Sequence, residues 1–87
     1  MLSPQILTQL IQTQLADARV ELQDLTGGGD HWQAVIVSPA FTGKSRVQRH
    51  QLVYQALQGV LKTNELHALT MKTLTPEEWG QEVPETR

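Results

Sequence analysis

Two of the chain's three histidines stand at the beginnings of two predicted β-strands, where their imidazoles could bind a metal. His31 follows a glycine-rich turn, and His67 follows a polar loop. Histidine is the commonest metal ligand in proteins, and its side chain titrates close to neutral pH. The first residues of neighbouring strands lie at the same end of a sheet only when the strands are parallel. His31 and His67 are therefore candidate ligands of one metal site if their strands are parallel, and antiparallel pairing would separate them.

A cluster of basic residues occurs where the chain is predicted to enter a helix. Lys44, Arg46 and Arg49 carry its positive charge, and His50 follows them. Such a cluster could contact phosphate groups of nucleic acid or an acidic protein surface, and a solvated helix face explains it equally well. The net charge of −2 gives no general attraction to nucleic acid, so such binding would depend on this patch. We interpret His50 as a packing or surface residue.

The sequence carries no pattern typical of an enzyme. It contains no cysteine, and therefore no disulfide, thiolate ligand or thiol nucleophile. The run Gly27-Gly28-Gly29 lacks both the GxGxxG spacing of dinucleotide-binding loops and the lysine of a P-loop. The acidic pair Glu77-Glu78 lies at a predicted helix N-terminus, where the helix dipole already favours negative charge. We expect a protein without catalytic activity.

Hydrophobic periodicity and capping residues predict three helices and three strands in the order α-β-β-α-β-α. The helices are expected over 3–16, over 45–61 and from 75 onward, and the strands over 18–25, 31–38 and 66–74. The glycine-rich turn joins the first two strands into an antiparallel hairpin. The segment 39–65 is long enough for a crossover that would make the third strand parallel to the second. The expected fold class is α+β, with a three-stranded mixed sheet and helices on one face.

The apolar residues of the two long helices predict which of their faces are buried. The stripe of the first helix consists of Ile6, Leu7, Leu10, Ile11 and Leu15. The stripe of the second helix consists of Val47, Tyr54, Leu57 and Leu61, with help from Val53 and Val60.

The length of 87 residues predicts one domain over 1–87, with its core within about 3–80 and a fraying polar tail at 81–87. The N-terminal segment has neither the basic region nor the continuous apolar run of a signal peptide. No segment reaches the roughly 18 apolar residues of a membrane-spanning helix. We therefore expect a soluble cytoplasmic protein that does not bind membranes.

Three segments of the chain are similar to the BolA family, and the resemblance extends from about Val20 to Trp79. The segments are Val35-Ile36-Val37-Ser38, Phe41-x-Gly43-Lys44-Ser45-Arg46-Val47 and His67-Ala68-Leu69. The resemblance implies a small KH-like domain of the class II type. It is strongest to a bacterial branch in which a histidine, here His31, takes the place of a cysteine in the hairpin loop of other members.

The resemblance implies a partner protein rather than a reaction. BolA proteins bind monothiol glutaredoxins of the CGFS type and share a bridged 2Fe–2S cluster with them. The glutaredoxin cysteine and glutathione supply thiolates, and the BolA protein supplies the histidine matching His67 and a loop residue matching His31, which is a histidine here. Imidazole can replace thiolate on one iron of such a cluster. The isolated chain is then expected to hold no cofactor, because it has no thiolate of its own.

Two alternatives of other classes remain open. Some BolA proteins are linked to transcriptional control, which makes a DNA- or RNA-binding regulator using Lys44, Arg46 and Arg49 the second hypothesis. KH domains clamp nucleic acid with a GXXG loop, and Gly43-Lys44-Ser45-Arg46 lacks the second glycine. The third hypothesis is a weak homodimer that uses an exposed face or edge of the sheet.

Overall fold

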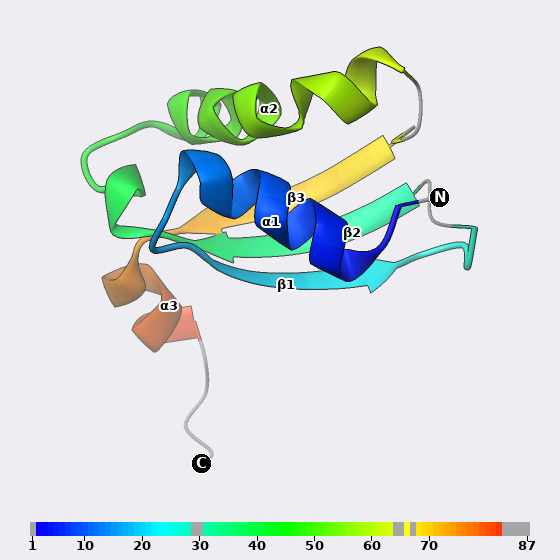
Figure 1. Ribbon diagram of the computed structural model, residues 1–87. Coiled ribbons are helices and arrows are strands. Elements are labelled where there is room, and N and C mark those ends of the chain that lie inside the picture. The colour runs from blue at the N-terminus through cyan, green and yellow to red at the C-terminus, as the bar shows by residue number, and fades with distance from the viewer. Residues whose placement is uncertain (1, 29–30, 64–65, 67, 83–87) are drawn as a thin grey trace.

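The computed structural model describes residues 2–28, 31–63, 66 and 68–82 of the chain. The elements follow the predicted order (Figure 1). They are α1 (Pro4–Gln14), β1 (Arg19–Asp24), β2 (His31–Val37), a short 3-10 turn (Pro39–Phe41), α2 (Arg46–Lys62), β3 (Ala68–Leu74) and α3 (Pro76–Glu82).

Each helix begins at a residue whose side chain accepts a hydrogen bond from a backbone N–H of the first turn. The Ser3 hydroxyl accepts from the N–H of Ile6 at 3.2 Å. Ser45 and Gln48 form a reciprocal capping box at the start of α2. Thr75 begins α3, and this helix start is described below because it takes part in a larger network. These bonds satisfy N–H groups that have no partner within the helix, which explains why the boundaries follow the sequence closely.

The three strands form one mixed sheet in the order β1-β2-β3. Strands β1 and β2 are antiparallel, with Arg19 opposite Val37 and Asp24 opposite Trp32. Strands β2 and β3 are parallel, with His31 opposite Ala68 at their beginnings and Val37 opposite Leu74 at their ends. The predicted hairpin and the predicted parallel crossover are both confirmed.

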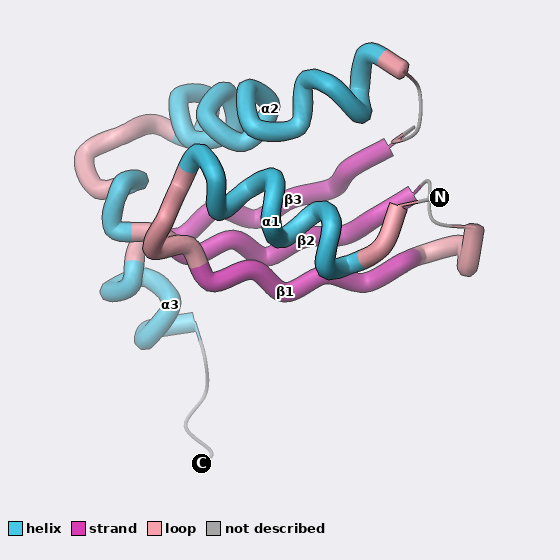
Figure 2. Tube along the Cα trace, in the orientation of Figure 1, coloured by secondary structure: helices cyan, strands magenta, loops and turns pink. Residues whose placement is uncertain are grey.

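Helices α1 and α2 lie side by side over one face of the sheet (Figures 1 and 2). This face is apolar because alternate residues of β2 point toward the helices. The most deeply buried apolar residues include members of both helices, of β2 and of the 3-10 turn: Leu7, Ile11, Trp32, Ala34, Ile36, Phe41, Val53 and Leu57. Within the described residues, no helix is long and apolar enough to cross a membrane.

The predicted buried stripe of α2 is wrong for two of its residues. Val47 is 65% exposed and Tyr54 is 42% exposed. The helix instead buries Val53 and Leu57, which are four residues apart and therefore adjacent on the helix surface. The apolar residues of α2 occupy more than one face, and docking against the sheet and α1 decides which of them are covered. In α1, Ile6 of the predicted buried stripe is likewise exposed, at 43%.

The third helix departs from the arrangement in which all helices share one face. Arg19, Val37 and Leu74 lie opposite one another across the three strands, and their side chains point away from α1 and α2. Val37 and Leu74 are nevertheless buried, and the Arg19 guanidinium lies 5.5 Å from the centre of the Trp79 ring. Helix α3 therefore covers one end of the other face of the sheet, as Figure 1 shows.

Candidate functional site

One candidate site lies where β2 and β3 begin. Because these strands are parallel, His31 stands directly opposite Ala68, the residue that follows His67 in the sequence. His31 is partly buried, and its carbonyl accepts a hydrogen bond of 2.9 Å from the N–H of Leu25. Its neighbour Trp32 points into the core, so the imidazole projects from the face opposite α1 and α2. His67, the other predicted ligand, lies outside the described residues.

The hairpin turn before His31 is shaped by one carboxylate. Asp24 accepts hydrogen bonds from the N–H groups of Thr26 and Gly27 at 3.2 and 2.9 Å. Gly27 has φ of +80°, a conformation that residues with a Cβ rarely adopt. This short-range geometry is typical of an Asx turn. Asp24 is thus a turn-forming residue, and it turns the chain back toward β2.

The donor chemistry at this end fits a ligand set that is shared with a second protein. Across the described part of the chain, no group of three or more His, Asp or Glu side chains could hold a metal ion. The chain also contributes no thiolate, because it has no cysteine. A cluster iron can accept two imidazoles when thiolates hold the other iron. The imidazoles of His31 and His67 match that requirement in type and number.

A second candidate site lies at the other end of the sheet. A groove of about 810 Å³ runs along the edge of β3 and under the first turns of α2. Lys44, Arg46 and Arg49 all line it, so the structure brings the predicted basic patch together. Strands β2 and β3 each have seven residues, which places their two ends about 20 Å apart. Arg49, which bonds to Thr73 near the end of β3, is therefore far from His31, although the lining of the groove extends along the strands to Gln33 and Thr70.

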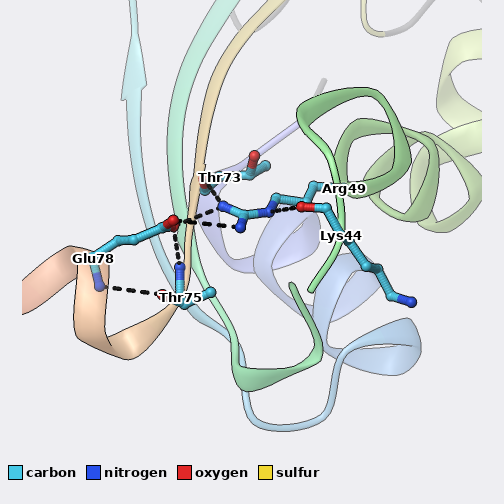
Figure 3. A network of polar contacts seen from close by, with 5 residues as sticks. All are labelled: Lys44, Arg49, Thr73, Thr75 and Glu78. Carbon is cyan, nitrogen blue, oxygen red and sulfur yellow. Dashed lines mark hydrogen bonds and ion pairs between the residues drawn. The ribbon is translucent and has the colours of Figure 1, made fainter. Parts of the chain in front are cut away.

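Arg49 is held inside a network that joins three elements (Figure 3). Its Nε donates to the carbonyl of Lys44 at 2.9 Å, and one terminal nitrogen donates to the carbonyl of Thr73 at 3.1 Å. The same nitrogen donates to Oε1 of Glu78 at 2.7 Å. The side chain of Arg49 is only 13% exposed. Its charge is thus engaged within the fold, whereas Lys44 and Arg46 are exposed to solvent.

Glu78 also completes the start of α3. Its Oε1 accepts from the N–H of Thr75 at 2.8 Å, while the Thr75 hydroxyl accepts from the N–H of Glu78 at 3.2 Å. This is the capping box that the sequence predicts. The hydrogen bonds from Arg49 and Thr75 to the carboxylate lower the pKa of Glu78 below its usual range. The carboxylate is therefore charged throughout the neutral pH range.

Lys72 lines the groove and was not part of the predicted basic patch, and His50, which belongs to the basic cluster in the sequence, lines it too. Lys72 of β3 adds positive charge, and its alternation with buried Thr73 is the signal that could have identified it. His50 lies on the α2 side. Burial and, after it, the nearby Arg46 guanidinium lower the pKa of His50. Its imidazole is therefore neutral at neutral pH, and the positive charge of the groove comes from lysine and arginine.

Comparison with known proteins places the chain among proteins of one family. The family model described as BolA-like protein matches residues 2–78. The acid stress protein IbaG of Escherichia coli K12 is 38% identical over 74 residues, which cover 83% of this chain and 87% of IbaG.

Two solved structures share both the fold and the sequence similarity. The BolA protein homologue from Coxiella burnetii has a TM-score of 0.78 and 36% identity, covering 92% of this chain and 99% of that one. The BolA domain of SufE1 from Arabidopsis thaliana has a TM-score of 0.76 and 34% identity, covering 90% of this chain and 99% of that domain.

Proposed function

The chain belongs to the BolA-like family, and from that premise we propose that it is a non-enzymatic adaptor in iron–sulfur metabolism. It binds a monothiol CGFS glutaredoxin and contributes His67 and His31 to a 2Fe–2S cluster that the two proteins share with glutathione. Its role is to influence the trafficking of the cluster or the sensing of iron and redox state. The similarity to the BolA domain of SufE1 is consistent with a role of this kind.

The parallel pairing of β2 and β3 is the observation that supports this proposal most strongly. It sets His31 opposite the residue that follows His67. Antiparallel strands would have put the two sequence positions at opposite ends of the sheet. Because Trp32 points into the core, His31 projects from the opposite face of the sheet. Helices α1 and α2 lie on the other face (Figure 1), so a partner can approach His31 without displacing either helix.

The chemistry of the ligands agrees with a shared cluster. When bound, the cluster supplies the iron sites and the electron-transfer capacity, and the chain supplies imidazoles to one iron. Thiolate is a softer ligand than imidazole and suits iron–sulfur clusters better. A family member with histidine rather than cysteine in the hairpin is therefore expected to hold the cluster more weakly and to release it more readily.

Anaerobic reconstitution tests the proposal. The purified chain is mixed with a CGFS glutaredoxin, glutathione, iron and sulfide, and visible absorption and circular dichroism spectra are recorded. We expect spectra distinct from those of the glutaredoxin homodimer's cluster. The His67→Ala variant should lose them, although the two apo proteins still associate. Spectra identical to those of glutaredoxin alone would refute the shared cluster, and an unchanged spectrum in the variant would refute the role of His67.

The basic groove supports a second candidate function, binding of DNA or RNA in a regulatory role. Lys44 and Arg46 are exposed along it, and Lys72 adds to its charge. Arg49 would act indirectly, because its guanidinium is already engaged by Glu78. Binding through phosphates should weaken steeply with salt as counterions are released. Absence of any electrophoretic retardation at low salt would remove this function.

A further inference from the structure

Strand β3 is an edge strand, since the sheet order is β1-β2-β3. The N–H of Ser38 donates to the carbonyl of Leu74, so the backbone polar groups of Leu74 point toward β2. Backbone groups alternate in direction along a strand. The N–H and carbonyl groups of Leu69, Met71 and Thr73 therefore point away from β2, toward the open edge.

The Arg49–Glu78 pair closes one end of this edge. The outward carbonyl of Thr73 accepts from Arg49, and the N–H of Thr75 donates to Glu78 (Figure 3). On the N-terminal side of the Thr73 carbonyl, three sets of backbone groups face the open edge: those of Leu69, those of Met71 and the N–H of Thr73. Such a row of backbone donors and acceptors can pair with an added strand. The ion pair thus defines where an added strand must stop.

The charges beside the open edge are positive on both sides. Lys72 lies on the face of the sheet opposite α2, because its strand neighbours Met71 and Thr73 point toward the helices. Lys44 and Arg46 lie on the α2 side of the same groove. Among the described residues that line the groove, Glu78 supplies the negative charge, and Arg49 already neutralises it.

We propose that the edge of β3 is a strand-addition site for an extended acidic segment of a partner protein. The outward backbone groups supply hydrogen bonds, and Lys44, Arg46 and Lys72 select acidic side chains. A second copy of this chain fits less well, because pairing two β3 edges would bring like charges together. The edge site begins at Leu69, one residue after the one opposite His31, but it uses backbone groups and lysine and arginine side chains rather than imidazoles.

Nuclear magnetic resonance of the full, ¹⁵N-labelled chain tests the proposal. The probe is a hexapeptide of alternating glutamate and valine with both ends blocked. We expect the amide signals of Leu69, Met71 and Thr73 to shift on binding and their hydrogen exchange to slow about tenfold. The same peptide with its alternate amides N-methylated keeps its charge but loses its strand-pairing hydrogen bonds. Equal binding of that peptide would overturn the proposal.

Three variants of the chain separate the contribution of backbone hydrogen bonds to peptide binding from that of positive charge. Met71→Pro removes an N–H that faces the edge and leaves the groups facing β2 in place, so we expect binding to weaken about tenfold or more. Lys44→Glu should weaken binding about fivefold. Lys62→Glu is its matched control, being exposed at the other end of α2, and should bind as the parent does. Circular dichroism checks that each variant folds.

Two other results would overturn the proposal and identify a different ligand for the groove or the strand edge. Binding of oligothymidylate but not of the peptide, with shifts at the same amides, would assign the groove to single-stranded nucleic acid. A dimer seen by sedimentation that Met71→Pro abolishes, with no peptide binding, would assign the edge to a second copy. Loss of the shared cluster in His67→Ala has no bearing on any of these outcomes, so this proposal and the proposed function fail separately.

Discussion

The guanidinium of Arg49 on α2 and the carboxylate of Glu78 on α3 meet at 2.7 Å across the edge of β3. The two residues are 29 positions apart, and the pair joins helices that lie on opposite faces of the sheet. Through its bonds to Thr73 and Thr75, the same pair satisfies two backbone groups at the end of β3. We therefore infer that this ion pair holds α3 against the sheet.

Arg49→Ala should destabilise the chain and loosen α3. The carbonyl of the buried residue Thr73 loses its donor, which costs about 1–3 kcal/mol of unfolding free energy. Urea unfolding measures the loss, and hydrogen exchange should show faster opening of α3. Arg46→Ala is the control, because Arg46 is exposed, and it should change stability by less than about 0.5 kcal/mol. Equal effects of the two variants on stability would contradict the inference that the Arg49–Glu78 pair holds α3 against the sheet.

Glu78 should make the folding stability of the chain depend on pH in the acidic range. Its pKa is lowered in the folded state by Arg49 and by the N–H of Thr75. The folded state therefore favours the charged carboxylate. Its contribution to folding stability is fully present above the ordinary pKa of a glutamate. It is lost as the pH falls through the lowered folded value. The stability difference between the parent and Glu78→Gln should be largest at neutral pH and shrink in acid. A difference that does not change with pH would contradict this assignment.

The buried face of α2 can be tested by truncating side chains on its two sides. Leu57→Ala should cost about 2–5 kcal/mol, because Leu57 is fully enclosed. Val47→Ala should change stability by less than about 0.5 kcal/mol, because Val47 lies in solvent. Thermal unfolding of both variants measures the contrast. Similar losses in the two variants would support the face that the sequence pattern predicts instead.

Short-range chemistry explains which features of the fold could be predicted from the sequence. Ser3, Ser45 and Thr75 begin helices because each side chain bonds to a backbone group three residues away. The hairpin follows from the turn at Gly27, and Gly43 turns the chain with φ of +77°. The parallel crossover follows from the length of the connection between β2 and β3. The helix starts and the two glycine turns depend on residues close together in the chain, and the crossover depends on the length of its connection.

Features that depend on docking could not be predicted in the same way. Val47 and Tyr54 are apolar and helically spaced, but the position of α2 on the sheet leaves them outside the core. Arg49 was assigned to a surface patch, because no local signal reveals a partner 29 residues away. Helix α3 was expected beside the other helices, and the contact between Trp79 and Arg19 is what locates it. For the candidate site, sequence placed His31 and His67 at strand beginnings, and the register places His31 opposite Ala68.

The central claim is that histidine nitrogens of this chain bind the iron of a shared cluster. The most direct test labels the histidines of this chain with ¹⁵N and combines it with unlabelled glutaredoxin, glutathione, iron and sulfide. The reduced cluster is then measured by pulsed electron paramagnetic resonance. We predict ¹⁵N hyperfine couplings that disappear in part in His67→Ala and in His31→Ala, and that persist in His50→Ala. A mixed cluster without any ¹⁵N coupling from this chain would contradict the claim.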